Sequence, residues 1–282
     1  MWVCVHCSNK GFPEGELCME YKNILFEEIG GVALITLNRP KAFNTFNGAL
    51  ADELLDAVVT CSSTDSIRAV VLTGAGKCFC AGGDVKEFSD NMDQIGAHLT
   101  RLTGVIHSAI LRLQGMPKLV ITAVNGMAAG GGMSLALAGD LVYAHASARF
   151  TMAYTNIGAS PDGGASFMLP RLVGLRRAFE LVVENPILST EQAKQWGLIN
   201  DVISGSETDF REEILRRASV LASGPTQAYA RVKQLLYRSY GKTLESQLRY
   251  EAMCIIECSY TKDFKEGLAA FAEKRSPVFI GS

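Results

Sequence analysis

Two glycine-rich loops, each preceded by a short apolar segment, constrain the fold more than any other feature. Residues 69–72 (AVVL) lead into TGAGKCFCAGGD at 73–84, and residues 119–124 (LVITAV) lead into NGMAAGGG at 125–132. The apolar segments have the length and composition of buried strands, and glycines mark points where strands end. Glycine there permits positive φ and lets a ligand approach the backbone. Two such loops favour a binding site; tight strand–helix packing without a ligand is the alternative.

The two loops do not match the patterns that bind nucleotides. Neither contains G-x-G-x-x-G, and the phosphate-loop pattern G-x-x-x-x-G-K-[ST] is absent from the chain. Unpaired backbone N–H groups at a helix N-terminus, with the helix dipole behind them, suit developing negative charge. The pattern therefore favours stabilisation of an oxyanion over hydrolysis of a nucleotide.

The rest of the chain alternates strands and helices before it becomes helical. Apolar periodicity predicts strands at 24–29, 32–37 and 141–144, and it predicts helices at 47–63 and 95–113. Residues 148–170 are rich in glycine and turn formers. The last third is predicted as helices at 191–197, 210–223, 226–239, 244–258 and 263–274. This order indicates an α/β core followed by a helical appendage, with the boundary near residues 204–209.

Composition excludes several classes of function. The chain has 282 residues, a formal net charge of −2 and 48% apolar residues, which is typical of a globular protein. No basic stripe suggests nucleic acid, and no apolar run approaches the roughly 20 residues that span a bilayer. We therefore expect no nucleic-acid or membrane partner, a cytoplasmic location, and small molecules or copies of the chain as partners.

The N-terminal segment differs from the rest of the chain. Residues 1–18 carry Cys4, His6, Cys7 and Cys18 but have no basic start, sustained apolar core or cleavage site of a signal peptide. A zinc site built on Cys4 and Cys7 lacks a second close pair of ligands, so we expect no metal. We interpret the segment as a disordered or artefactual leader, with Met19 as a plausible start.

Three motifs resemble those of the crotonase (enoyl-CoA hydratase/isomerase) superfamily. They are FCAGGD at 79–84, NGMAAGGG at 125–132, and the segment from DFKEG to FAEKR at 263–275. The motifs resemble most closely the branches of epoxyphenylacetyl-CoA isomerase and 4-chlorobenzoyl-CoA dehalogenase. The resemblance covers residues 21–279 and implies an α/β fold, namely a spiral of ββα units with a C-terminal helical trimerisation region.

The resemblance also implies how the chain is divided and what it binds. The expected parts are the leader at 1–18, a catalytic core at 19–205 and a helical oligomerisation region at 206–282. Such proteins form homotrimers or hexamers that bind an acyl-CoA thioester. No cofactor is expected, because coenzyme A is part of the substrate.

By position, the resemblance assigns the two oxyanion N–H groups to Gly83 and Gly131. These groups would hold the thioester carbonyl, and losing one such donor costs about 10²–10³ in rate. Coenzyme A would run along two loops and reach the C-terminal helix of the same or a neighbouring subunit. The residues implied for this path are Lys41, Ala42, Phe43, Ala81, Gly82, Phe271 and Lys274.

The expected acid–base residues depart from the hydratase pattern. Hydratases of this family carry two glutamates, at the positions of Ser134 and Tyr154, and neither residue here is a carboxylate. We expect both to line the acyl pocket. Asp162 matches the catalytic aspartate of the isomerase branch, although a turn role in Pro-Asp-Gly is the alternative. His107 matches a histidine of the dehalogenase, with core packing as its alternative.

One carboxylate can remove a proton from one carbon and return it to another across an enolate, which moves a C=C bond. We therefore predict an enoyl-CoA isomerase that uses Asp162, with His107 as a second catalytic candidate. The alternatives are an enoyl-CoA hydratase, an aroyl-CoA dehalogenase or thioester hydrolase using the same pair, and a non-catalytic CoA-binding protein. A helix is predicted at about 131–138. A serine hydrolase built on Ser134 is disfavoured, because this residue falls inside that helix and not at a strand-to-helix turn.

Overall fold

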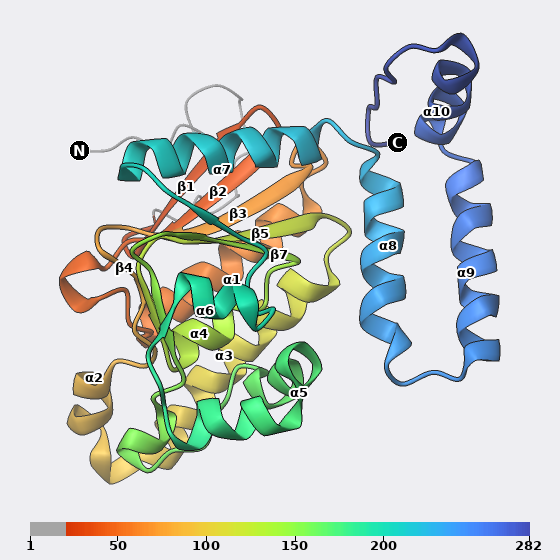
Figure 1. Cartoon of the computed structure of the whole chain (residues 1–282). Helices are drawn as coiled ribbons and strands as arrows, with labels where there is room; N and C mark the ends of the chain where they lie inside the picture. Colours follow the sequence, from red (N-terminus) through yellow and green to blue (C-terminus); the bar gives the residue numbers. More distant parts are fainter. Residues whose placement is uncertain (1–20) are drawn as a thin grey trace, which may run out of the picture.

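The computed structural model describes residues 21–282, which form a core and a projecting helical arm (Figure 1). The leader at 1–18, with the residues considered for zinc, lies outside the described residues. Met19 lies outside them as well. No helix between residues 21 and 282 has the length and apolar character needed to cross a membrane.

A six-stranded sheet organises the core. Its order is β1-β2-β3-β5-β7-β10, in which β1 is antiparallel to β2 and the other pairs are parallel. The strands are β1 (Ile24–Ile29), β2 (Val32–Leu37), β3 (Ala69–Gly74), β5 (Leu119–Val124), β7 (Leu141–His145) and β10 (Asp201–Ile203). Because parallel strands end at the same edge, the loops that follow β2, β3 and β5 leave the sheet together.

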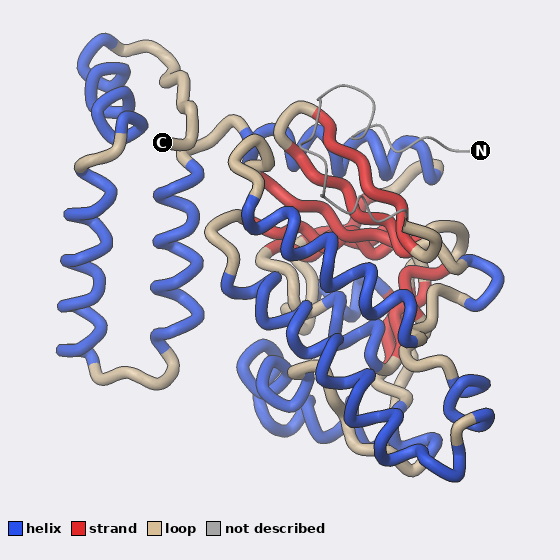
Figure 2. The backbone as a smooth tube through the Cα atoms, turned by 180° about the vertical axis from the view of Figure 1, so that it is seen from behind, coloured by secondary structure: helices blue, strands red, loops and turns tan. Residues whose placement is uncertain are grey.

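Helices cover both faces of this sheet, so its middle strands are almost continuous apolar runs. Val70 and Leu72 of β3 belong to the cluster that includes α1 (Gly48–Ser63) and α3 (Ile95–Gly115). The alternate residues Ala69 and Val71 belong to a second cluster under α7 (Glu207–Ala222). Figures 1 and 2 show α7 on one side of the sheet and α1 and α3 on the other.

A second, smaller sheet was not predicted from the sequence. Its order is β4-β6-β8-β9, and its members are β4 (Cys78–Cys80), β6 (Met127–Ala129), β8 (Arg149–Thr151) and β9 (Leu188–Ser189). Strands β4 and β6 lie inside the segments interpreted as plain glycine loops. Strands of two or three residues show no alternation that a pattern could detect, which explains why they were missed.

The remaining helices surround the two sheets. The segment at 148–170, interpreted as turn-rich, contains the start of a helix, α5, which accommodates Pro170 near its beginning and is interrupted at Gly174 with φ +76°. The elements of this group are η1 (Pro40–Ala42), α2 (Val85–Asp90), η2 (Met92–Gln94), α4 (Gly131–Ala136), η3 (Tyr154–Ile157), α5 (Ala165–Val183) and α6 (Thr190–Gln195).

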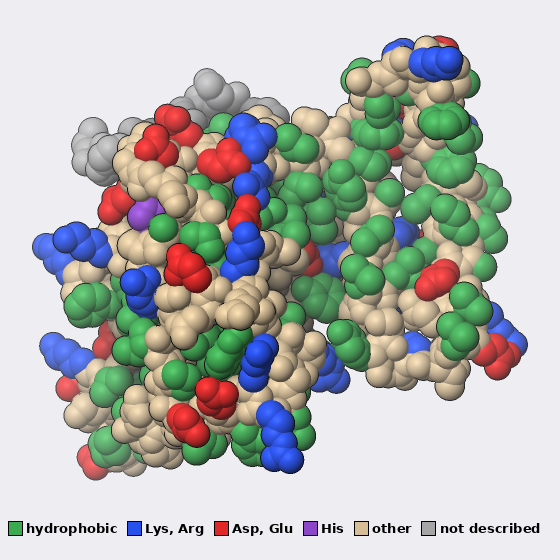
Figure 3. Space-filling model, in the orientation of Figure 1, with side chains coloured by type: hydrophobic (Ala, Val, Ile, Leu, Met, Phe, Trp, Pro, Cys, Tyr) green, Lys and Arg blue, Asp and Glu red, His purple; other side chains and the backbone are tan. Residues whose placement is uncertain are grey.

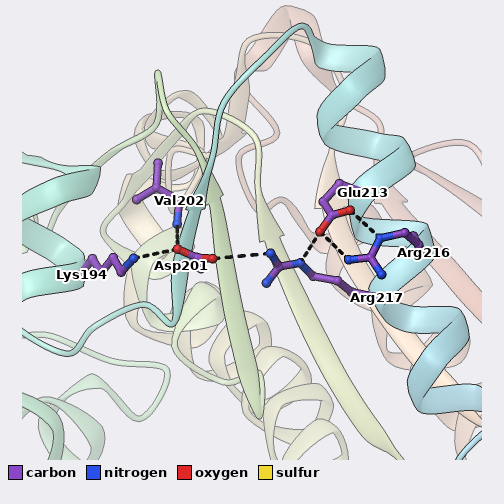
Figure 4. A network of polar contacts seen from close by, with 6 residues as sticks. All are labelled: Lys194, Asp201, Val202, Glu213, Arg216 and Arg217. Atoms are coloured by element: carbon purple, nitrogen blue, oxygen red, sulfur yellow. Dashed lines mark hydrogen bonds and ion pairs between the residues drawn. The ribbon is translucent and has the colours of Figure 1, made fainter.

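Helix α7 belongs to the core, which moves the expected boundary at 205/206. Phe210, Ile214 and Ala218 of α7 are buried against the large sheet. Polar contacts reinforce this packing: Arg217 of α7 reaches Asp201 of β10, which also binds Lys194 of α6 (Figure 4). The segment that projects from the core therefore begins after α7.

The arm consists of α8 (Thr226–Ser239), α9 (Leu244–Ser259) and α10 (Lys262–Glu273). Its root is fixed by Lys233, whose Nζ lies 2.8 Å from Asp140 Oδ2 and 2.6 Å from the carbonyl oxygen of Leu113. Burial lowers the pKa of Lys233 and raises that of Asp140, while their mutual attraction opposes both shifts. The buried pair attaches α8 to the turn between α4 and β7.

Candidate active site

The structure brings the two predicted oxyanion glycines together. Strands β4 and β6 are parallel with Cys80 opposite Ala128, and Gly83 and Gly131 each follow these partners by three residues. A Cβ placed on Gly82 would lie 3.2 Å from the backbone nitrogen of Gly131. The small sheet therefore holds both glycine loops side by side at one end.

Gly83 is oriented by a short backbone pairing with Phe46. The N–H of Phe46 donates to the carbonyl of Gly82 at 2.7 Å, and the N–H of Asp84 donates to the carbonyl of Phe46 at 2.9 Å. In such a bridge the residue between the two partners directs its own N–H to the opposite side. Gly83 thus turns its N–H away from Phe46, and no backbone bond among residues 21–282 uses it.

Gly131 presents its N–H in a different way, as the first residue of α4. The first N–H groups of a helix have no acceptor within the helix and carry the positive end of its dipole. In both loops the preceding residue is a glycine with positive φ, +87° at Gly82 and +54° at Gly130. That conformation, which other residues rarely adopt, redirects the chain just before each predicted donor.

An ion pair holds the loop of Gly83 from outside. Arg39 Nη2 lies 2.9 Å from Asp84 Oδ2, and both side chains are mostly buried. Asp84 also caps α2 through the N–H of Glu87. Burial alone would raise the pKa of Asp84, but the hydrogen bond and charge of Arg39, together with the capping bond, lower it below its usual value.

Two segments predicted for the coenzyme A path are adjacent. The N–H of Ala81 donates to the carbonyl of Phe43 at 3.0 Å, so residues 41–43 run beside residues 81–83. Lys41 and Phe43 are exposed, as a binding surface requires. Phe271 and Lys274, also exposed, lie on or next to α10 in the arm, on the opposite side of the molecule from β4 (Figure 1), so one chain does not bring them to this surface.

The predicted acid–base residues form a second cluster. The hydroxyl of Tyr154 donates to Asp162 Oδ1 and lies 3.1 Å from Ser134 Oγ. Ser134 Oγ also donates to the backbone carbonyl of Asp162 at 2.9 Å. From α3, His107 Nε2 accepts the N–H of Gly163 at 3.2 Å, which requires the unprotonated nitrogen there. Residues of α3, α4 and η3 thus meet at the loop of Asp162.

This cluster adjoins the glycine end of the site. A Cβ on Gly131 would lie 3.6 Å from the hydroxyl of Tyr154 and 3.5 Å from the ring of Phe46. Burial, followed by the charge and hydrogen bond of Asp162, raises the pKa of Tyr154 well above its ordinary value. A protonated tyrosine therefore stands between the helix N-terminus and the carboxylate.

Ser134 does not have the geometry of a hydrolase nucleophile. It is the fourth residue of α4, is fully buried, and its Oγ lies within hydrogen-bond distance of the carbonyl oxygens of Gly130 and Asp162 and of the hydroxyl of Tyr154. A nucleophile elbow places its serine exposed at the turn after a strand. The expectation that Ser134 lies inside a helix is confirmed.

A cavity of about 180 Å³ lies elsewhere in the core. It separates the large sheet from the start of α7, between residues such as Leu34, Val71 and Phe210. The residues described around it include none of those predicted for the site. The candidate site is therefore located by the functional groups that lie together there and not by the volume of a cavity.

Comparisons with known proteins identify the family of the chain. A family model described as enoyl-CoA hydratase/isomerase matches residues 27–282. The chain belongs to the enoyl-CoA hydratase/isomerase family. A 1,2-epoxyphenylacetyl-CoA isomerase of Escherichia coli is 38% identical over 258 residues, covering 89% of this chain and 95% of that protein. A 4-chlorobenzoyl coenzyme A dehalogenase-1 of Arthrobacter sp is 36% identical over 253 residues, covering 89% and 91%.

A solved structure of similar shape supports the fold. An enoyl-CoA hydratase from Polaromonas sp. JS666 superposes with a TM-score of 0.87 at 33% identity, covering 91% of this chain and 99% of that one. The predicted crotonase-type α/β fold is confirmed, and so is membership of an acyl-CoA enzyme family. These relatives carry the names of an isomerase, a dehalogenase and a hydratase, so family membership leaves the reaction open.

Two phenylalanines at the site were not singled out in the sequence. Phe46 pairs with Gly83 and touches the side of Gly131, whereas the ring of Phe88 occupies the space where a Cβ of Gly83 would stand, 2.4 Å from Cζ. An aromatic residue carries no chemistry that a motif search could flag. The only signal in the sequence is that Phe88 closely follows the first glycine motif, FCAGGD at 79–84, and lies within α2.

Proposed function

We propose that this enzyme is an enoyl-CoA isomerase that moves a C=C bond with one carboxylate, Asp162. The thioester carbonyl would accept the N–H groups of Gly83 and Gly131, which stabilise the enolate formed when a proton leaves the acyl chain. Asp162 would take that proton from one carbon and return it to another. The reaction needs no cofactor beyond the coenzyme A of the substrate.

The observation that carries this proposal is the place of Asp162. Its carboxylate is hydrogen-bonded to Tyr154, whose hydroxyl lies against Gly131. A base in this place would lie close to the carbons bonded to a carbonyl held at Gly131. A proton shift needs one base that can reach two carbons, and one carboxylate meets that requirement.

The hydratase alternative is less well supported by the same residues. Adding water through two carboxylates needs acidic side chains at Ser134 and Tyr154, and both positions carry hydroxyl groups hydrogen-bonded to the loop of Asp162. The dehalogenase alternative requires Asp162 to attack carbon as a nucleophile. The isomerase proposal asks only for proton transfer, and a hydrogen-bonded carboxylate is suited to that task.

Solvent exchange tests the role of Asp162 directly. Wild-type enzyme incubated with 2-enoyl- or 3-enoyl-CoA in D₂O should place deuterium at the α or γ carbon, as read by mass spectrometry. Asp162→Asn keeps the side-chain shape but removes the base, so exchange and isomerisation should fall by about 10³ or more. Binding of the CoA thioester should be unchanged.

Asp52, which is exposed on α1, offers a matched control. Asp52→Asn should exchange deuterium at the wild-type rate. Undiminished exchange in Asp162→Asn would remove this carboxylate from the mechanism. Release of halide from an aroyl-CoA, without exchange on any enoyl-CoA, would establish the dehalogenase alternative; tight CoA binding without turnover would support the non-catalytic one.

We also propose that the arm assembles the enzyme into a homotrimer or a dimer of trimers. Apolar side chains cover much of its exposed surface (Figure 3), among them Leu244, Leu248, Ile255, Ile256, Leu268 and Phe271. Patches of this extent are typical of subunit interfaces. A neighbouring arm could then supply Phe271 and Lys274 to the coenzyme A surface. Light scattering of the full chain tests this: a monomer at micromolar concentration contradicts the proposal.

A further inference from the structure

Tyr154 has a hydrogen-bonding position that base catalysis by Asp162 alone does not explain. Its hydroxyl contacts Asp162 Oδ1 on one side and Ser134 Oγ on the other. An ionised carboxylate can only accept, so the single hydroxyl hydrogen of Tyr154 is committed to Asp162. Ser134 holds the same loop through the carbonyl of Asp162. The carboxylate is therefore tethered at one oxygen and at its own backbone.

The second carboxylate oxygen is left unused by the protein. Among residues 21–282, no hydrogen bond is made to Asp162 Oδ2. The two oxygens are thus unequal: Oδ1 is held by a buried donor, while Oδ2 is available to a bound acyl chain. A carboxylate fixed at one oxygen cannot turn freely about its terminal bond.

The backbone at Tyr154 supports a dedicated role. The residue before it, Ala153, adopts the left-handed conformation with φ +51°. Alanine has no side-chain hydrogen bond that could favour this conformation, which is costly for residues with a Cβ. Such strain is retained where the surrounding structure requires it, often beside functional groups. Here it sets the start of η3 and the direction in which Tyr154 leaves the chain.

Tyr154 also remains a donor under all working conditions. Burial and the neighbouring Asp162 oppose its ionisation, so the phenol keeps its hydrogen far above neutral pH. The titratable groups that the structure places against the Asp162 loop are Tyr154 from η3 and His107 from α3. Of these, only Tyr154 touches the carboxylate.

We propose that Tyr154 is the positioning residue of the single-carboxylate reaction: it occupies Oδ1 of Asp162 so that Oδ2 alone carries the proton between two carbons. This inference rests on the proposed isomerase function. Oδ2 takes the proton from the first carbon as its C–H bond breaks and the enolate forms. The same oxygen returns the proton to the second carbon as the new C–H bond forms, so charge and protons balance without a second acid.

Tyr154→Phe removes the tether and keeps the ring. We expect kcat for isomerisation to fall by about 10- to 100-fold, the range expected for losing a hydrogen bond to a charged group, while KM changes little. We also expect more solvent deuterium in the product per turnover, because a freely turning carboxylate exchanges its proton before returning it. The acid limb of the kcat/KM profile should move to higher pH, since the carboxylate anion loses its donor.

Tyr21 provides a matched control, because its hydroxyl also donates to an aspartate, Asp56 Oδ2, at 2.5 Å and away from the site. Tyr21→Phe should leave kcat, deuterium incorporation and the pH profile unchanged. If Tyr154→Phe does not fold, Ser134→Ala serves in its place: it removes one of the contacts of the tyrosine hydroxyl and should move the same three quantities in the same direction by smaller amounts.

The outcomes separate this inference from the proposed function. If Asp162→Asn abolishes exchange but Tyr154→Phe keeps the wild-type kcat, deuterium content and pH profile, then Asp162 is the base and Tyr154 does not position it. If Asp162→Asn leaves exchange intact, the proposed function fails first. If Tyr154→Phe lowers the stability of the protein but leaves its deuterium content and pH profile unchanged, then Tyr154 has a structural role only.

Discussion

The glycine end of the candidate site is made of backbone, whereas the acid–base end is made of side chains. Gly83 and Gly131 present N–H groups whose places follow from strand pairing, a helix start and two positive-φ glycines. At the other end, Tyr154 and Asp162 depend on hydrogen bonds between side chains from different elements. The first end can remain the same while the second changes residue by residue.

This difference explains how one family can include proteins named isomerase, dehalogenase and hydratase. Backbone donors serve any reaction that places negative charge on a thioester oxygen. The reaction then depends on which acid or base faces the acyl chain. In the proposed function that group is a single carboxylate, Asp162, because hydroxyl-bearing residues stand where the resemblance places the glutamates of hydratases.

Of the variants at Gly82, His107 and Asp84, the largest effect is expected from Gly82, where a substitution disturbs the backbone end without replacing its donors. Gly82→Ala places a Cβ 3.0 Å from the carbonyl oxygen of Ala129 and 3.2 Å from the nitrogen of Gly131, at φ +87°. The strained chain must move the next N–H, that of Gly83. We expect kcat to fall by about 100-fold, comparable to loss of one oxyanion donor. Steady-state kinetics on a 3-enoyl-CoA measures it.

Gly30→Ala controls for backbone strain alone. Gly30 lies in the turn between β1 and β2 with φ +55°, and a Cβ there meets nothing within 4 Å. This variant should lose about 1 kcal/mol of stability, the cost of a left-handed alanine, with kcat unchanged. If Gly82→Ala retained full activity, the glycine end would not stabilise the negative charge, and the proposed division between a backbone end and a side-chain end would be wrong.

The two ends also differed in how well they could be predicted from sequence. Glycines at strand ends indicated the two loops, because glycine permits the positive φ that Gly82 and Gly130 adopt, and the family resemblance then assigned the donors to Gly83 and Gly131. Their alignment depends on β4 and β6, which are too short to detect. The contact between His107 and Gly163 joins residues 56 positions apart and has no local signal. Likewise, α7 was assigned to the appendage because its helical pattern could not show which surface it packs on.

An intermediate effect is expected at the side-chain end, from His107. His107→Phe removes the acceptor of the buried N–H of Gly163, which is costly to leave unpaired beside Asp162. We expect kcat to fall by about tenfold. His107→Gln retains an acceptor and should keep most of the activity. If both variants are equally impaired, His107 carries protons itself, and the dehalogenase or hydrolase alternative gains support.

The smallest effect is expected where a side chain supports the backbone end. Asp84→Asn can still cap α2 but loses its charge against Arg39 Nη2, 2.9 Å away. We expect a loss of about 1–2 kcal/mol in unfolding free energy and a decrease in kcat well below that of Gly82→Ala, because Gly83 keeps its pairing with Phe46. Asp201→Asn, in the more exposed contact with Lys194, should cost less than about 1 kcal/mol and leave kcat unchanged.

The pH dependence of the stability lost in Asp84→Asn gives a sharper test, because the pKa of Asp84 is lowered in the folded protein. A carboxyl group of this kind contributes stability that is fully present above its unfolded pKa, about 4, and is lost as pH falls through the folded value. Urea midpoints of wild type and Asp84→Asn should therefore differ by a constant amount between pH 6 and 8 and converge in acid, below about pH 4. A difference that persists undiminished at pH 3 would mean that shape at this position matters and charge does not, so the loop of Gly83 would be held by backbone pairing alone.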